Sequence, residues 1–308
     1  MHIFKQKLFL LAVVLISSLI IIYNIHKSDI SSIESVKYLC NKLDIDNKSE
    51  LSVHRKNIIE SMAYGINSKL IYSVNTRNRD IFAIYDCNSR MVTDFSNDKE
   101  DRLLKDIVKN NNNISTKFSS ENAARAILSS IYAKLDLPSN LELATVTLDN
   151  TNAEWIARWI HKLHGIDYEN DYVIITISAV NGELLGFSRR ITNNECKTNA
   201  KITRKEAIDT AYKKFSNSFP KDLWAKNNDK FEVKSAELKI VEVKLLFNKI
   251  FNTLFSRPYE VKLAWVVEFD TKKGMENKTI FVIKNDVSFI RVDALTNNIL
   301  NSDINLVF

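Results

Sequence analysis

Three segments of this chain share one phrase, a β-prone run that enters a polar turn and leaves it through an apolar residue. Residues 176–184 read Thr-Ile-Ser-Ala-Val-Asn-Gly-Glu-Leu, and residues 291–299 read Arg-Val-Asp-Ala-Leu-Thr-Asn-Asn-Ile. Residues 84–92, Ile-Tyr-Asp-Cys-Asn-Ser-Arg-Met-Val, follow the same plan. A phrase that recurs within one chain indicates a structural unit used more than once. We therefore expect each copy to form a closing β-hairpin in one of several related units.

Helical patterns precede the later two hairpins. Ser119 and Ser120 are candidate N-caps for a helix whose face carries Ala123, Ile127, Ile131 and Leu135. Thr203 and Glu206 have the spacing of a capping box, in which each side chain bonds the backbone at the other's position. Helices followed by runs of strands, without βαβ alternation, are typical of an α+β fold.

Hydrophobic periodicity places the remaining elements. A juxtamembrane helix or tether is expected at 29–46, and helices are expected from about residue 49 onward and at 98–109. The asparagine run 110–113 is the best domain boundary, because it lacks apolar residues and favours turns. The expected domains are 1–27, 28–113, 114–197 and 198–308. Strands are expected at 69–75, 80–86, 91–95, 141–149, 154–162, 172–179, 183–190, 231–247, 259–270, 278–284 and 289–294.

The first 27 residues have the pattern of a membrane anchor. An uncharged apolar run from Leu8 to Tyr23 follows Lys5 and Lys7, and with its flank it reaches about 18 residues, near the minimum for a transmembrane helix. A cleaved signal peptide has the same basic start, although no small-x-small site ends this run. We expect an uncleaved single-pass anchor in the cell membrane, with a cytoplasmic N-terminus and residues 28–308 outside the cytoplasm.

Composition limits the classes of function. The net charge is +6, but Lys5, Lys7 and Lys27 flank the apolar run. Without them, 40 basic residues are balanced against 37 acidic ones, a net charge of only +3. This balance is too mild for a nucleic-acid binder, so no nucleic-acid partner is expected. The 5 glycines are scattered singly and form no phosphate-binding loop. Cys40, Cys87 and Cys196 make neither a metal half-site nor a disulfide framework. No cofactor is expected, and isolated buried thiols are favoured over one disulfide.

The last unit resembles a PepSY-type domain. It has Thr203-Arg204-Lys205-Glu206-Ala207 at its start, Tyr259-Glu260-Val261 with Trp265 in a strand, and a Val292-Asp293-Ala294 hairpin. The middle unit is similar to the repeated domain of YcdB/YcdC-like bacterial proteins, through Trp159-Ile160-His161 and Asn181-Gly182-Glu183-Leu184. The turn glycine of this family is Gly182 in the middle unit and Asn297 in the last. The resemblance implies tandem helix-plus-antiparallel-sheet units, tethered to the membrane, that bind or restrain an envelope protein; it carries no active site.

Candidate chemical residues have plainer explanations. His161 and His164 are the only histidines three apart, but on the expected strand they would point to opposite faces, which favours surface or rim histidines over a metal site. Cys87 and Cys196 have no neighbouring histidine and no nucleophile elbow. Asp86 and Asp293 stand where strands enter turns, a position that favours bonds to turn amides over acid–base catalysis. No catalytic or metal residue is predicted.

The aromatic residues of the strands leave two interpretations open. Trp155, Trp159, Tyr259 and Trp265 fit core packing best, and a ligand-binding sheet face is the alternative. The leading functional hypothesis is a non-enzymatic, membrane-anchored binding or regulatory protein with a protein or peptide partner in the cell envelope. The alternative is an extracytoplasmic hydrolase or metal-dependent enzyme whose site the sequence does not reveal. A structural component of an envelope assembly is a third possibility.

Overall fold

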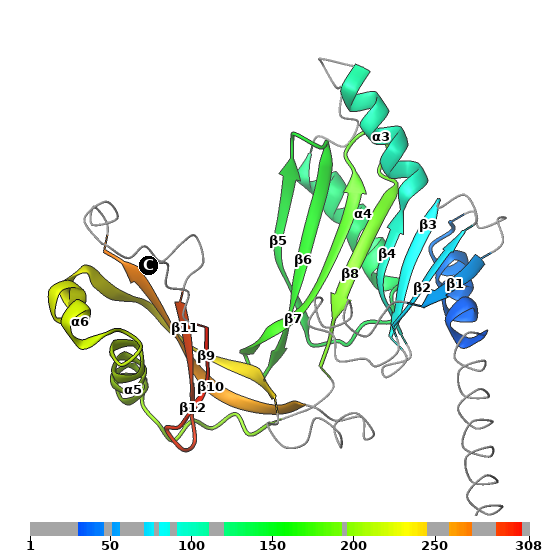
Figure 1. Cartoon of the computed structure of the whole chain (residues 1–308). Helices are drawn as coiled ribbons and strands as arrows, with labels where there is room; N and C mark the ends of the chain where they lie inside the picture. The colour runs from blue at the N-terminus through cyan, green and yellow to red at the C-terminus, as the bar shows by residue number, and fades with distance from the viewer. Residues whose placement is uncertain are drawn as a thin grey trace, which may run out of the picture. The chain divides into compact units, whose positions relative to one another are not determined.

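The computed structural model describes residues 30–45, 51–55, 71–76, 80–86, 91–110, 120–192, 196–244, 259–272 and 288–303 (Figure 1). They form a mixed α+β fold in which strands predominate. Contacts divide the chain into two compact units, each described here by itself. Unit 1 comprises Met1–Ser139, Leu143–Trp159 and Tyr172–Arg190, and unit 2 comprises Asn140–Glu142, Ile160–Asp171 and Ile191–Phe308.

Unit 1 is built on a sheet whose strands are bonded in the order β1-β2-β3-β4-β8-β7, with β6 beside β7 and β5 beside β6. Neighbours from β1 to β7 along this path are antiparallel. Its strands are β1 Leu51–Arg55, β2 Ile71–Thr76, β3 Ile81–Asp86, β4 Met91–Asn97, β5 Leu141–Asp149, β6 Glu154–Leu163, β7 Ile166–Ser178 and β8 Leu184–Arg190. Strands β5, β6 and β7 also contribute residues to unit 2.

One face of this sheet forms the core of unit 1. Alternate residues of β7, Val173, Ile175 and Ile177, have no exposed surface, as the two-residue period of a strand requires. Phe187 of β8 lies opposite Ile175, and its ring stacks on Phe95 of β4 with centroids 5.8 Å apart. Burial of each such side chain stabilises the fold by about 1.5–3 kcal/mol.

Three helices accompany this sheet in the described part of unit 1. Residues 30–42 form a helix whose Ser31 hydroxyl bonds the Tyr85 hydroxyl of β3. Helix α3, Asp98–Asn110, packs Leu104 against Leu185 of β8. Helix α4, Glu121–Ala133, begins at the N-cap Ser120 and stacks Tyr132 on Trp159 of β6. In Figure 1 α4 lies behind the strands and α3 lies across their upper end.

Unit 2 contains an antiparallel sheet in the order β9-β10-β11-β12. Helix α5, Arg204–Ser216, lies on this sheet and stacks Phe215 on Phe269 at 4.3 Å. The first part of β7 pairs with β9 in parallel, Tyr168 opposite Ile240. The other elements are α6 Lys221–Asn227, a 3₁₀ turn at Asn228–Lys230, β9 Phe231–Lys244, β10 Tyr259–Thr271, β11 Ser288–Asp293 and β12 Ile299–Asp303.

Several expected elements are confirmed. Strand β5 has the predicted bounds, both predicted N-caps accept backbone amides, and Thr203 with Glu206 forms the full capping box. The helix expected in 29–46 is present over 30–42. The expected strand 278–284 and asparagine boundary 111–113 lie outside the described residues.

Two expectations were wrong. The helix predicted from about residue 49 is contradicted at Leu51–Arg55, which is strand β1, because pairing with β2 overrides a weak helical pattern. The purely antiparallel sheets are contradicted by the parallel contact between β7 and β9. A contact between segments about seventy residues apart has no local sequence signal.

Candidate functional site

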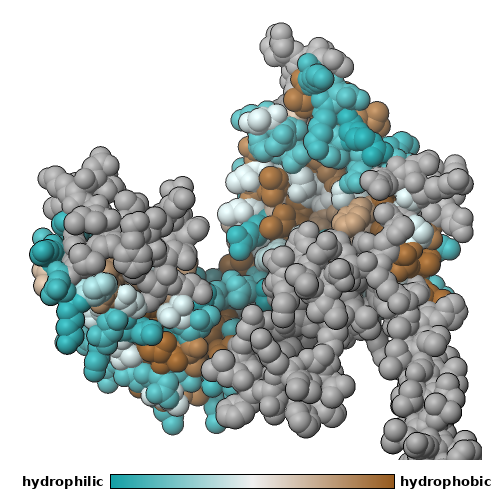
Figure 2. All heavy atoms as spheres, in the orientation of Figure 1, coloured by the Kyte–Doolittle hydropathy of each residue, from teal (hydrophilic) through white to brown (hydrophobic). Residues whose placement is uncertain are grey.

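Strand β5 is the outermost described strand of its sheet, and β6 is its one described neighbour (Figure 1). Residues 143–148, Leu-Ala-Thr-Val-Thr-Leu, contain no charge and no proline, the two devices that most often protect an edge strand. Four successive side chains, Glu142 to Thr145, are exposed. Figure 2 contrasts the hydrophilic surface of α3 with the white and brown surface of the strands below it. The outer edge of β5 thus has no strand partner among the described residues.

The charges at the two ends of β5 are already engaged. Glu142 forms an ion pair with Lys162 of β6 at 2.6 Å. The Asp149 carboxylate accepts hydrogen bonds from the backbone amides of Thr151 and Asn152. These bonds and a third from the Asn152 side chain lower the pKa of Asp149. Neither charge lies within residues 143–148, the central part of the strand edge.

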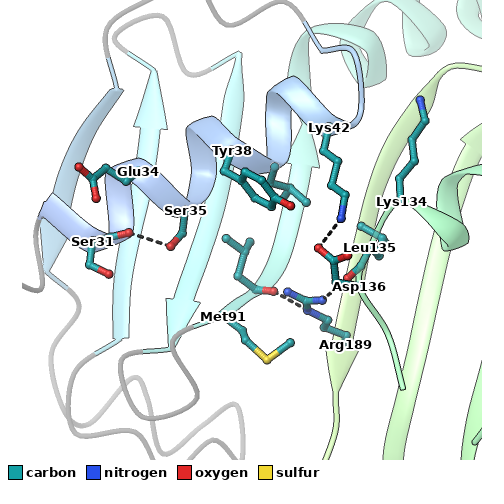
Figure 3. A pocket seen from close by; sticks show the side chains of 12 residues that line it. Ser31, Glu34, Ser35, Tyr38, Lys42, Met91, Lys134, Leu135, Asp136 and Arg189 are labelled. Carbon is teal, nitrogen blue, oxygen red and sulfur yellow. Dashed lines mark hydrogen bonds and ion pairs between the residues drawn. The ribbon is translucent and has the colours of Figure 1, made fainter. Parts of the chain in front are cut away.

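A second feature of unit 1 is a cavity of about 380 Å³ between the helix 30–42, the end of α4 and strands β4 and β8. Figure 3 shows its lining side chains. They combine apolar groups, two serine hydroxyls and five charged groups. The lining residues are Ser31, Glu34, Ser35, Tyr38, Leu39, Lys42, Met91, Val92, Lys134, Leu135, Asp136 and Arg189.

Arg189 lies at one end of this cavity and is bound to backbone carbonyls. Its Nε donates to the Val92 carbonyl oxygen at 2.7 Å, and its Nη1 donates to that of Leu135 at 2.9 Å. Among the described residues, no carboxylate lies within ion-pair distance of its guanidinium. Burial lowers the pKa of Arg189 to about 10, an effect that Asp136 partly opposes. The side chain remains charged at neutral pH and is poorly hydrated.

The two cavity lysines differ from Arg189 because each has a carboxylate partner. Lys42 pairs with Asp136 and also lies over the Tyr38 ring, 5.4 Å from its centroid. Lys134 pairs with Asp44 at 2.7 Å. The bond to Asp136 raises the pKa of Lys42.

Unit 2 contains a buried polar network around His161. The ring Nδ1 lies 2.7 Å from Asp171 Oδ2, and Nε2 lies 2.8 Å from Asn140 Nδ2. Because that amide nitrogen also donates to the Lys162 carbonyl, the contacts fit the imidazole tautomer with its proton on Nδ1. The ring stacks on Tyr168 with centroids 4.2 Å apart. Both ring nitrogens are therefore occupied within the fold.

Within unit 2 the network continues from Asp171 to Thr192 and to Glu242 of β9. The Thr192 backbone amide donates to Asp171 Oδ2 at 2.6 Å, and its hydroxyl lies 2.8 Å from both Asp171 Oδ1 and Glu242 Oε1. These bonds connect three elements: strand β7, strand β9 and the segment that follows β8. The network thus holds three segments of unit 2 together.

The expectation that His161 is a surface or rim residue was wrong. Only 4% of its surface is exposed, because the turn between β6 and β7 brings Asp171 beside it. His164 is exposed in that turn at φ 51°, and its Nδ1 lies 3.2 Å from the Thr198 hydroxyl. The two histidines are not brought together, and sequence spacing gave no signal for the partner ten residues away.

The predicted turn role of Asp293 is confirmed. Its Oδ1 accepts the backbone amides of Leu295 and Thr296 at 2.8 and 3.1 Å. Asp86 ends β3, and the turn that follows it, 87–90, lies outside the described residues together with Cys87. Cys40 is buried, and Cys196 is half-buried with a pKa raised by burial. A raised thiol pKa disfavours the nucleophilic thiolate.

The tryptophans of the strands pack in the cores. Trp155 and Trp159 are each 5% exposed, and the indole Nε1 of Trp265 donates to the Ile202 carbonyl at 2.9 Å. Core packing is confirmed for these three residues. The side chain of Tyr259 lies outside the described part of the structure.

The described part of the chain contains no group of three His, Cys, Asp or Glu side chains arranged to hold a metal ion. No described helix is long and apolar enough to cross a membrane. The anchor predicted in residues 1–27 lies outside the described residues. Comparison with protein-family models gave no match, and a search of curated proteins gave no significant relative.

Proposed function

We propose that this chain is a non-enzymatic, membrane-anchored binding or regulatory protein that acts outside the cytoplasm. In this proposal residues 1–27 anchor it, and its PepSY-like units hold or restrain a protein of the cell envelope. The observation that supports it is the uncharged outer edge of β5 in unit 1. We infer that this edge binds an extended segment of the partner.

The chemistry of a strand edge favours this kind of ligand. The outward amide and carbonyl groups of an edge strand are complementary to another extended backbone, which adds to the sheet as a further strand. Each main-chain hydrogen bond formed in this way contributes about 0.5–1.5 kcal/mol net. A nine-residue strand offers about 30 Å of edge. The exposed Leu143 side chain adds an apolar contact.

The test uses two variants that introduce the same charge at different positions. Leu143 on β5 and Ile107 on α3 are each 37% exposed, so Leu143→Lys and Ile107→Lys place the same charge at equal exposure. A photo-cross-linking side chain at Thr145 of the full-length chain, in its native membrane, should form an adduct with one specific protein. Leu143→Lys should abolish that adduct, and Ile107→Lys should preserve it.

Three outcomes would contradict this proposal. Equal loss or equal retention of the adduct in both variants would exclude β5 as the binding edge. An adduct of twice the 35.5 kDa chain mass would identify a second copy as the occupant. Hydrolysis of peptides or glycans by the purified protein, abolished by His161→Ala or Cys196→Ala, would instead establish the enzymatic alternative.

A further inference from the structure

Among the described residues, the Arg189 guanidinium in the cavity of unit 1 uses only part of its hydrogen-bonding capacity, and it also lies 5.7 Å from the centroid of the Phe187 ring. A guanidinium has five N–H donors, and Arg189 directs two of them at the Val92 and Leu135 carbonyls. Both acceptors are neutral. Burial of a charged group is unfavourable unless an opposite charge or further hydrogen bonds compensate for it. Arg189 is therefore the group of this cavity that gains most from a bound anion.

The surrounding charges leave this position open. Lys42 and Lys134 are paired with Asp136 and Asp44, so they do not compete strongly with Arg189 for an anion. The remaining lining carboxylate is that of Glu34, which Figure 3 shows at the far end of the cavity from Arg189. The end of the cavity beside Arg189 thus has unbalanced positive charge.

The remaining walls indicate what the anion is attached to. Leu39 and Leu135 are buried, Met91 is half-buried, and Tyr38 is exposed over 60% of its surface. The hydroxyls of Ser31 and Ser35 lie on the helix side. A volume near 380 Å³ suits one small group. A compact apolar body with a single carboxylate matches both the walls and the cation.

We propose that this cavity binds the carboxylate of a small apolar acid, either a free acid or the C-terminal residue of a peptide. The carboxylate bonds the unused N–H groups of Arg189, and the apolar body contacts Tyr38 and Met91. Arg suits this role because its planar fork matches the two carboxylate oxygens. This site is separate from the β5 edge and goes beyond the proposed function.

The experiment compares ligands that differ only in charge. N-acetylleucine and its neutral amide are titrated by calorimetry into the full-length chain in lipid nanodiscs. The acid should bind at least tenfold more tightly than the amide. 4-Methylpentanoate separates the two sources, because a peptide C-terminus would favour N-acetylleucine and a free-acid site would favour 4-methylpentanoate or bind both equally.

Variants connect this binding to the cavity. Arg189→Gln should remove the preference for the acid, since it removes the positive charge that distinguishes the acid from the amide. Because this change also breaks two bonds to carbonyls, the exposed Tyr38→Ala provides a second test and should weaken binding at least threefold. Leu103→Ala, 48% exposed on α3, is the control and should have no effect. Equal binding of acid and amide, absence of saturable binding, or unchanged affinity in Tyr38→Ala would overturn the proposal.

Discussion

The hairpin that closes β7 and β8 in unit 1 and the hairpin that closes β11 and β12 in unit 2 use one hydrogen-bonding scheme. The Ser178 amide donates to the Glu183 carbonyl at 2.9 Å, and the Asp293 amide donates to the Asn298 carbonyl at 2.8 Å. The Gly182 and Asn297 amides return to the carbonyls of Ser178 and Asp293. The backbone of the turn is thus the same in both units.

The side chains that hold these turns differ. Ser178 Oγ contacts the two turn amides at 3.2 and 3.3 Å, whereas the Asp293 carboxylate accepts its two at 2.8 and 3.1 Å. The left-handed position is Gly182 at φ 81° in one hairpin and Asn297 at φ 61° in the other. The comparison teaches that the turn specifies an acceptor and a tolerant backbone position, and that several residue types meet each requirement.

The largest expected loss of stability comes from replacing Asp293, the side-chain acceptor in the turn of the second hairpin. Asp293 is 6% exposed, so Asp293→Ala leaves two turn amides without their acceptor and should lower the free energy of unfolding by about 2–3 kcal/mol. Asp293→Ser should recover part of this loss, because Ser178 shows that a hydroxyl suits the turn. Ser178→Ala should cost less, about 1 kcal/mol. Urea unfolding of the full chain measures all three, and an equal loss for Ser178→Ala and Asp293→Ala would break the comparison.

The left-handed position should give an intermediate effect. Gly182→Ala places a Cβ at positive φ and should cost about 1–2 kcal/mol. Asn297→Gly should be nearly neutral, because relief at positive φ offsets the lost bond from the Thr210 hydroxyl. Gly165→Ala is the matched control, since φ is 80° there and no heavy atom lies within 4 Å of its new Cβ. Amide exchange of the β8 and β12 strands locates each effect, and a tolerated Gly182→Ala would contradict the shared geometry.

The smallest expected effect is on the pH dependence of stability. It distinguishes α5 from α4, the helices that precede the two hairpins. Glu206 accepts bonds from the Thr203 amide and hydroxyl, which lower the pKa of its carboxyl. This depressed pKa stabilises α5 above the ordinary glutamate pKa, and the contribution is lost as the pH falls through the lower value of the folded state. The N-cap of α4, Ser120, has no titrating partner in its box.

Thermal unfolding of the parent and of Glu206→Gln across acidic pH measures this contribution. The parent should be slightly more stable above the ordinary glutamate pKa, and the two curves should merge below the lowered one. Ser120→Ala is the comparison and should destabilise the chain by an amount that does not change over this range. A difference between the parent and Glu206→Gln that grows on acidification would contradict the assigned sign.

Much of the fold was predictable from local patterns, and the functional contacts were not. The capping-box spacing of Thr203 and Glu206 predicts the start of α5 from four residues. The turn residues on either side of β5 predict where that strand begins and ends. In contrast, the partners of Arg189 are the carbonyls of Val92 and Leu135, far away in the chain. Backbone carbonyls occur at every residue, so no sequence pattern distinguishes the two that an arginine selects.

The buried network of His161 illustrates the same limit. His161 bonds Asn140 and Asp171, and Asp171 in turn bonds Thr192. These residues belong to three separate segments that the hairpin between β6 and β7 and the end of β8 bring together. The turn at His164 and Gly165 reverses the chain and sets the spacing between His161 and Asp171, and no sequence pattern predicted it.

The sequence alone determined the α+β class, the capped helices and the closing hairpins, because capping boxes, strand alternation and turn residues act over a few positions. Tertiary structure alone decided three properties: β5 pairs with one described strand, no described carboxylate forms an ion pair with Arg189, and His161 is buried. These properties depend on which surfaces meet, and such contacts join residues tens of positions apart. Sequence and tertiary structure both determine the repeated turn. Neighbouring residues set its backbone conformation, whereas tertiary contacts decide that Asp293 is buried.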